Sequence, residues 1–259
     1  MINFILSLPL WIGSIIAMGL STVSGLAVYF VSYKFISRYE SKDLKEVASS
    51  LFRVVGILIS LMLSLGFGEV VTQWRETDNI IQQEAVVITD SFLNLQRYDV
   101  ETTRDMRVIL IDYTQAVIDD DWPALANNNL GQRAGALYRE FSTRVIELEP
   151  ANSVQEELRS QIMSNVALMT DYRLVRLNNA MGKPPAFVYI IIFGFLITMV
   201  CFGVYQPKTP VVVLISLYTI FVGLVLYIIL SLSDPFQGGF GMEPNTFEQL
   251  VEGLRSMNK

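Results

Sequence analysis

Four long stretches of this chain contain almost no charged residues, and this property constrains the fold more than any other. A membrane-spanning helix needs about 20 mostly apolar residues to cross roughly 30 Å of hydrocarbon. The stretches that approach or exceed this length cover residues 1–33, 54–71, 186–204 and 211–230. One small globular core could hardly bury four such surfaces away from water. The sequence therefore predicts an integral membrane protein with four transmembrane helices.

The composition agrees with a membrane protein and argues against several classes of function. Hydrophobic residues make up 52% of the chain and charged residues 17%. The formal net charge of −6, without clustered Lys and Arg, argues against a nucleic-acid partner. The chain has no histidine and one cysteine, Cys201, so it cannot build a Cys/His zinc site or a disulfide framework. No catalytic motif stands out, and we predict neither an enzyme nor a bound cofactor or metal.

The segments between the spans define the expected fold class. Residues 72–184 carry apolar side chains at helical spacing and predict a soluble helical bundle between the second and third spans. Residues 34–53 form a basic connector, and 231–259 form a C-terminal tail. The last bundle helix begins at Ser153, with Glu156 as its capping-box partner. The fold class is thus an all-α membrane protein with four transmembrane helices and an inserted helical bundle.

The second span has no turn signal at its end. The apolar pattern continues through Trp74 and Ile81 to Leu95, so we expect one continuous helix that ends at 96–99. Proline is tolerated in the first turn of a helix, and Pro184-Pro185 accordingly opens the third span.

Basic residues bear on the orientation in a bacterial inner membrane. The first connector holds five of them, and Lys208 lies in the second connector, 206–210. By the positive-inside rule both connectors would be cytoplasmic, with the helical domain and both termini extracytoplasmic. Arg173, Arg176 and Lys183 flank the third span on the opposite side and weaken this signal.

Small residues recur every four positions in the first two spans. They are Gly13, Ala17, Ser21 and Gly25 in the first span, and Gly56, Ser60, Ser64 and Gly68 in the second. Such stripes let helix backbones approach closely in lipid, so a helix-packing face is one interpretation. The alternative for the second stripe is a pore wall whose hydroxyls hydrogen-bond a partly dehydrated ion. Glu69, the only acid within the limits of any span, is a further candidate functional residue.

Three consecutive acids, Asp119 to Asp121, precede Trp122-Pro123. Carboxylate oxygens suit a hard cation such as calcium, but the loop lacks the alternating acids and the glycine of a calcium-binding loop. Consecutive acids also point in different directions around a helix end. We therefore interpret this segment as a solvated acidic turn.

Short motifs spread over nearly the whole chain carry a resemblance to a known family. After the fourth span the chain reads Ser233-Asp234-Pro235-Phe236-Gln237-Gly238, then Gly241-Met242-Glu243-Pro244 and Phe247. Earlier matches are Trp74, Glu84-Ala85, Tyr113, Asp121-Trp122, Arg173 and Arg176-Leu177. Together they resemble the bestrophin-like family of bacterial and plastid membrane proteins.

The resemblance implies a four-span protein whose relatives in the bestrophin class assemble as oligomeric anion channels. The expected partners are accordingly the lipid bilayer, further copies of the chain and small ions. Bestrophins place their soluble helices in the cytoplasm, which is the opposite of the orientation that the basic residues favour. The alternative function is a membrane-anchored helical sensor, or an envelope scaffold protein, for an unknown ligand.

The tail motif Asp234, Pro235, Phe236, Gly238 and Pro244 has physical consequences as well. We expect Pro235 to stop the fourth helix and Gly238 to permit a tight reversal of the chain. Phe236 and Phe240 are expected to anchor in the membrane interface, and the alternative to a simple turn is a segment that lines an exit.

Overall fold

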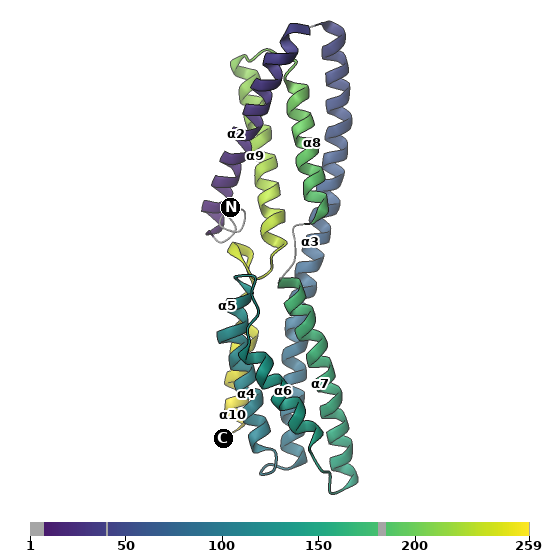
Figure 1. Cartoon of the computed structure of the whole chain (residues 1–259), viewed down its shortest axis with the longest axis vertical. Helices are drawn as coiled ribbons and strands as arrows, with labels where there is room; N and C mark the ends of the chain where they lie inside the picture. Colours follow the sequence, from purple (N-terminus) through teal and green to yellow (C-terminus); the bar gives the residue numbers. More distant parts are fainter. Residues whose placement is uncertain (1–7, 40, 181–184, 259) are drawn as a thin grey trace. The chain divides into compact units, whose positions relative to one another are not determined.

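The computed structural model describes residues 8–39, 41–180 and 185–258, and every regular element in this part of the chain is a helix (Figure 1). The long apolar helices are α2 (Leu10–Ile36), α8 (Ala186–Phe202), α9 (Thr209–Leu232) and the first part of α3 (Lys42–Tyr98). The remaining α-helices are α4 (Arg104–Ala116), α5 (Trp122–Leu125), α6 (Arg133–Ile146), α7 (Ser153–Ala180) and α10 (Asn245–Met257). Three single turns complete the list: η1 (Ser37–Tyr39), the π-helical η2 (Val117–Asp121) and η3 (Gly238–Phe240). The predictions that Met1 belongs to the first span and that Pro184 opens the third concern residues outside the described part of the chain.

The chain divides into two compact units. The first unit comprises the described residues of 1–73, 183–233 and 238–240, and the second unit those of 74–182, 234–237 and 241–259. Helix α3 belongs to both units and is continuous from Lys42 to Tyr98, which confirms the predicted uninterrupted helix and its end.

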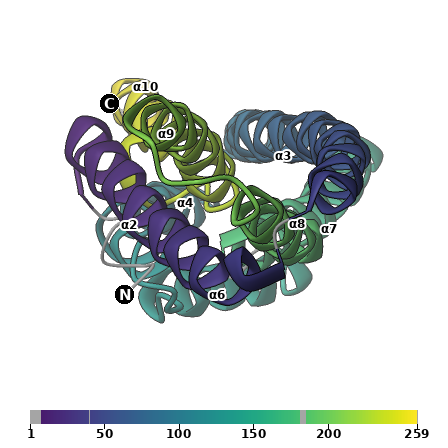
Figure 2. The ribbon, with the colours of Figure 1, turned by 90° about the horizontal axis from the view of Figure 1, so that it is seen from above.

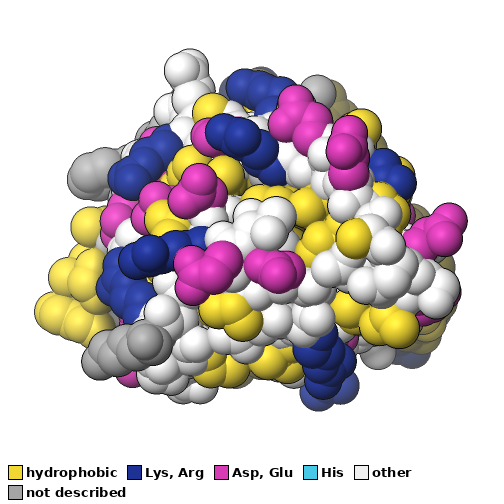
Figure 3. All heavy atoms as spheres, turned by 90° about the horizontal axis from the view of Figure 1, so that it is seen from below, with side chains coloured by type: hydrophobic (Ala, Val, Ile, Leu, Met, Phe, Trp, Pro, Cys, Tyr) yellow, Lys and Arg dark blue, Asp and Glu magenta, His cyan; other side chains and the backbone are white. Residues whose placement is uncertain are grey.

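Among the described residues, three helices are long and apolar enough to cross a membrane: α2 with η1, α3 and α9. Helix α8 is also apolar but shorter, with 17 residues. Many large apolar side chains of the first unit are exposed, among them Trp11, Val23, Leu65 and Leu214. Such a surface suits hydrocarbon as its solvent, in agreement with a membrane protein. The face of the molecule in Figure 3, by contrast, carries interspersed acidic and basic side chains, as expected for a surface in water.

Helix α2 packs against α9 and α8 in the first unit (Figure 2). A Cβ atom at Gly25 would meet the side chains of Thr219 and Phe195, and one at Gly223 would lie 2.6 Å from the Cβ of Ser21. The Ser21 hydroxyl donates to the carbonyl oxygen of Thr219 over 2.8 Å. The small residues of the first span therefore form a packing face, as one interpretation of the sequence predicted.

The second unit has an apolar core to which several helices contribute. Its fully buried members include Phe92 and Leu95 of α3, Leu110 of α4, Phe141 of α6, Ile162 and Met169 of α7, and Phe247 and Leu254 of α10. The sequence analysis did not predict helix α10 in the tail. The helical spacing of Phe247, Val251 and Leu254 could have indicated it, and the structure shows all three buried.

The predicted cap of α7 is displaced by one residue. The Asn152 carboxamide oxygen accepts a hydrogen bond from the Gln155 backbone N–H, at 2.9 Å, and the Gln155 side chain accepts one from the Ala151 N–H, at 2.8 Å. The prediction that Ser153 and Glu156 form the capping box is therefore wrong. Asn152 takes the role because asparagine is an equally good N-cap and lies directly before the first helical residue.

Candidate functional site

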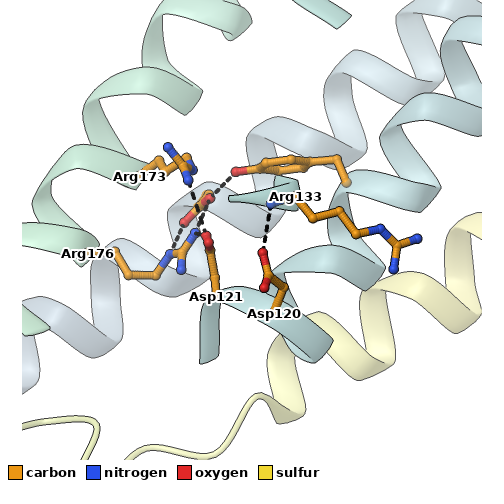
Figure 4. A network of polar contacts seen from close by, with 7 residues as sticks. Asp120, Asp121, Arg133, Arg173 and Arg176 are labelled. Carbon is orange, nitrogen blue, oxygen red and sulfur yellow. Dashed lines mark hydrogen bonds and ion pairs between the residues drawn. The ribbon is translucent and has the colours of Figure 1, made fainter. Parts of the chain in front are cut away.

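A network of buried charges lies inside the second unit (Figure 4). The guanidinium of Arg176 contacts Glu84 through Nε, 2.8 Å from Oε2, and through Nη2, 3.2 Å from Oε1. The same Nη2 lies 3.3 Å from Asp121 Oδ2, and Arg173 Nη2 lies 3.5 Å from that oxygen. The Tyr113 hydroxyl donates to Glu84 Oε1 over 2.7 Å. Two acids, two arginines and a phenol therefore form one connected group.

Local structure explains how four separate elements meet at this point. Arg173 and Arg176 are three residues apart on α7, so both side chains leave the same face of the helix. Asp121 is the last residue of the π-helical turn η2, where a widened turn re-aims side chains; such turns are frequent at functional sites. Glu84 falls at helical spacing between the core residues Ile81 and Ile88 of α3, which places it on the apolar face.

The turn around Asp121 is held from its other side. Asp120 accepts a hydrogen bond from the backbone N–H of Arg133, at 2.8 Å, at the start of α6 (Figure 4). A Cβ atom on Gly131 would lie 2.8 Å from Asp120 Oδ2 and 2.8 Å from the Cα of Asp121. Position 131 therefore requires glycine because the backbone passes directly against the two acids.

Burial makes the network electrostatically strong. Glu84, Asp121 and Arg176 are each 0% exposed. The Arg176 guanidinium carbon lies 5.9 Å from the centre of the Trp122 ring and 5.6 Å from that of Phe247, so aromatic faces supply further cation–π contacts. Removing charges from water costs several kcal/mol per ion in real proteins, so such a group persists only when its members stay paired.

The pKa directions follow from this geometry. Burial alone would lower the pKa of Arg176, but the charges of Glu84, Tyr113 and Asp121 and the hydrogen bond to Glu84 together raise it above its ordinary value. Burial raises the pKa of Tyr113 well above its ordinary value, and the charge of Glu84 adds to the effect. Burial also raises the pKa of Asp121, although Arg176 and Arg173 oppose the shift. Arg176 is therefore permanently charged, and Tyr113 remains a hydrogen-bond donor.

The predicted solvated acidic turn is correct for only part of the segment. Asp119 is exposed and Asp120 half-buried, but Asp121 is fully buried in the network. The prediction failed for Asp121 because its partners come from α7, far away in the sequence. No group of three or more His, Cys, Asp or Glu side chains among the described residues could hold a metal ion.

The tail motif supports the same region through Trp122. Phe236 is 5% exposed and packs edge-on against the Trp122 ring, at 5.2 Å between centroids, so it belongs to the core of the second unit. The expectation that Phe236 anchors in the membrane interface is therefore wrong. The Trp122 indole N–H donates to the Met242 carbonyl oxygen over 2.9 Å, which holds the segment after the motif against η2 and α5.

The backbone of the motif turns as expected. The Asp234 carboxylate accepts a hydrogen bond from the Phe236 N–H over 3.3 Å, and the Pro235 carbonyl oxygen accepts one from the Met242 N–H over 2.8 Å. Gly238 has a φ of 73°, a conformation that glycine adopts without steric cost. Pro244 precedes the first residue of α10.

The small residues of the second span lie on the surface of the first unit. Ser60, Ser64, Gly68 and Glu69 are exposed and Gly56 is half-buried. A Cβ atom at Gly56 or Gly68 would meet nothing within 4 Å. Helix α3 instead packs through other residues, since Gly66 approaches Phe187 and Ile59 approaches Gly194. This stripe therefore forms no packing face within the described part of the chain.

Comparison with known proteins identifies the family of this chain. The model of the bestrophin-like domain matches residues 19–247. The chain belongs to the bestrophin-like family. The bestrophin-like match includes every residue of the network and the tail motif up to Phe247. No curated protein matches the chain.

Solved structures share the bestrophin-like fold at low identity. A bacterial bestrophin homologue from Klebsiella pneumoniae is 12% identical, with a TM-score of 0.69 over 94% of this chain and 98% of that chain. A single-substitution variant of the homologue, also 12% identical, gives a TM-score of 0.67 over the same shares. At this identity the likeness concerns the fold.

The network residues were all among the short motifs that carry the family resemblance, but the sequence analysis did not predict that they form one site. For two of them, the position on an apolar helix face could have indicated a buried charge. Glu84 lies between Ile81 and Ile88, and Arg176 follows Met169 and Arg173 on the face of α7 that carries the core residues. A charged residue on an apolar helix face requires a buried partner, although the sequence does not say which one.

Proposed function

We propose that this protein is an oligomeric ion channel, with anions as the expected passing species, in which α3 lies nearest the axis. The observation that carries the proposal is the uncovered stripe of Gly56, Ser60, Ser64 and Gly68. In hydrocarbon, small side chains at a helix surface forfeit packing contacts unless another helix faces them, whereas serine hydroxyls suit the wall of an aqueous path. Further copies of the chain around a common axis would provide that path.

In this proposal four helices cross the bilayer: α2, the first part of α3, α8 and α9. The 17 residues of α8 rise about 26 Å at 1.5 Å per residue, close to the roughly 30 Å of hydrocarbon. Residues 72–184 then form the soluble bundle, and 231–259 the tail that packs on it. The basic residues of both connectors support a cytoplasmic location of the connectors and an extracytoplasmic location of the bundle.

The chemistry of the stripe suits weak, transient contact with an ion. The Ser60 hydroxyl donates to its own helix, to the Gly56 carbonyl oxygen at 2.8 Å. It can turn away from that carbonyl to donate to a passing anion, because the carbonyl keeps its helical hydrogen bond. Glu69 places a carboxylate at one end of the stripe, where it favours cations. Glu69→Gln should therefore raise the ratio of anion to cation flux.

The test is ion efflux from liposomes that contain the purified protein. We expect efflux above that of empty vesicles and a decrease of at least tenfold for Ser64→Trp, which fills the stripe. Ser64 is exposed, so this substitution disturbs no packing within the chain. Val23→Trp is the matched control, since Val23 is 68% exposed on α2, away from the stripe. Efflux equal to that of empty vesicles, or an unchanged rate for Ser64→Trp, contradicts the proposal.

One observation favours the second candidate, a membrane-anchored helical sensor or envelope scaffold. A polar groove of about 340 Å³ lies between α3 and α7 in the second unit, lined by Asp90, Leu93, Asn94, Arg97, Gln161, Ser164 and Asn165. Its amides and charges would suit a small polar ligand. Crosslinking of intact cells through a photoreactive group at Ser164 tests this function, and recovery of the uncrosslinked chain alone counts against it.

A further inference from the structure

A groove in the first unit borders part of the small-residue stripe of α3. It encloses about 550 Å³ between α3 and α9. Gly56 and Ser60 of the stripe line it, and its other walls are mostly apolar or aromatic, with Tyr218 and Phe221 on the side of α9. Among the described residues that line the groove, Arg53 is the only charged one. A single cation therefore lies beside the stripe that we propose as the wall of the ion path.

The geometry of α3 places Arg53 on the same face as the stripe. Ser60 follows Arg53 by seven residues, which is nearly two complete helical turns. Both side chains are exposed. Arg53 thus precedes the stripe at the end where α3 leaves the first connector, whereas Glu69 lies at the opposite end.

No acid neutralises Arg53 within the described part of the chain. Its only described polar contact is a long hydrogen bond of 3.4 Å, from Nη2 to the hydroxyl oxygen of Ser49, one turn earlier on the same helix. Asp43 and Glu46 are the preceding acids of α3, but both are exposed and neither lines the groove. The groove therefore contains a positive charge without a negative partner from the chain.

Such a charge at the edge of the hydrocarbon requires water or a mobile counter-ion. Ionisable residues in membrane proteins face aqueous cavities or reach to the headgroups, because hydrocarbon does not solvate them. In an oligomer with a common axis, every copy contributes one Arg53, and rings of arginine or lysine favour anions in pores. The positive charge attracts anions to the path and repels cations.

We propose that Arg53 determines the anion preference of the ion path. The ions it selects are small inorganic anions such as chloride, which meet its guanidinium before they reach the hydroxyl of Ser60. This inference rests on the proposed channel function and adds the residue that distinguishes anions from cations.

The single cysteine of the chain permits a test in which only the charge at position 53 changes. In a Cys201→Ala background, Arg53→Cys is reconstituted and treated with a methanethiosulfonate reagent that attaches either a trimethylammonium or a sulfonate group. The reversal potential in a potassium chloride gradient gives the permeability ratio of chloride to potassium. The matched control is Arg38→Cys, because Arg38 is an exposed arginine of the same connector that does not line the groove.

We expect Arg53→Cys to lower the chloride-to-potassium ratio at least about fivefold, the effect of one basic residue near a membrane surface. The trimethylammonium group should restore the ratio, and the sulfonate group should lower it further. The same changes at position 38 should alter the ratio by less than about twofold, because salt screens a charge outside the groove. A folding defect cannot explain opposite effects of the two reagents, since both act on the same reconstituted protein.

Several results would overturn the proposal. If Arg53→Cys retains both ion flux and the original ratio, Arg53 does not select the ion, while the channel function stands. If neither reagent attaches at position 53, hydrocarbon or a packed helix fills the groove. If both reagents change the ratio in the same direction, or position 38 responds equally, the charge of Arg53 in the groove is not the cause. If the Cys201→Ala protein and the wild type both give only the flux of empty vesicles, the channel function falls and this inference falls with it.

Discussion

Arg176 holds two buried acids at once, and its removal should be among the most destabilising single changes in the second unit. Arg176→Met leaves Glu84 with only the Tyr113 hydroxyl as a donor among the described contacts, while Asp121 keeps Arg173 at 3.5 Å. Breaking a buried ion pair by removing one partner costs about 3–5 kcal/mol. We expect the free energy of unfolding to fall by this amount because the pair with Glu84 is lost. We expect no further large decrease from Asp121, because Arg173 still pairs with it.

The assay is thermal unfolding of the detergent-solubilised protein. A loss of this size should lower the Tm by roughly 10 °C, at about 2–4 °C per kcal/mol for a chain of this length. The matched control is Arg139→Met on α6, where the arginine is exposed and a change within about 0.5 kcal/mol is expected.

A double mutant separates the ion pair from the other contacts of Arg176. Glu84→Gln removes the charge that Arg176→Met would leave unpaired, so the double variant should be more stable than the sum of the two single effects predicts. The expected difference is at least about 2 kcal/mol. Strict additivity, or an Arg176→Met Tm equal to that of Arg139→Met, would refute the reasoning.

Three further outcomes follow from the described contacts. Gly131→Ala should destabilise the second unit by about 1–3 kcal/mol, because its Cβ would press on Asp121, whereas Gly56→Ala should leave the Tm unchanged, because nothing lies nearby. Phe247→Ala should cost about 3–5 kcal/mol in an unfolding experiment by opening a cavity under α10, and a loss below 1 kcal/mol would show that α10 does not pack as described. The pKa of Asp121 is raised above its unfolded value near 4, so its contribution to stability is fully present below about pH 4 and is lost as the pH rises through the folded pKa. The stability of the wild type relative to Asp121→Asn should therefore fall as the pH rises above about 4, and a difference in Tm that stays constant with rising pH would contradict the raised pKa.

Local signals were sufficient for much of the helical organisation. The uninterrupted apolar pattern beyond Val71 predicted the continuous α3, and the spacing of Gly13 to Gly25 predicted a packing face. The same kind of signal was present but unused in the tail, where Phe247, Val251 and Leu254 mark one face of α10. These features depend on the 3.6-residue period of the helix. This period can be read from a short window of the sequence, without knowing which other helices pack against it.

Other features depend on which faces meet. The stripes of the first and second spans are equally small and equally spaced, yet the first packs on α9 while the second stays uncovered. Nothing in either stripe distinguishes them, because the difference lies in the partner helix. Phe236 likewise lies in a membrane-adjacent motif but packs on Trp122, which is more than a hundred residues away in the sequence.

The sequence by itself determined that this protein has hydrocarbon-compatible helices, where α3 ends and which residues carry the family resemblance. Only the tertiary structure decided that Glu84, Tyr113, Asp121, Arg173 and Arg176 form one buried network. The physical reason is that hydrophobic periodicity is a local property of a helix, whereas the pairing of a buried charge depends on distance in space. In the sequence, Asp121 belongs to a run of three acids that resembles an exposed turn. In the structure, two arginines of α7 lie within 3.5 Å of its carboxylate, and the side chain is buried.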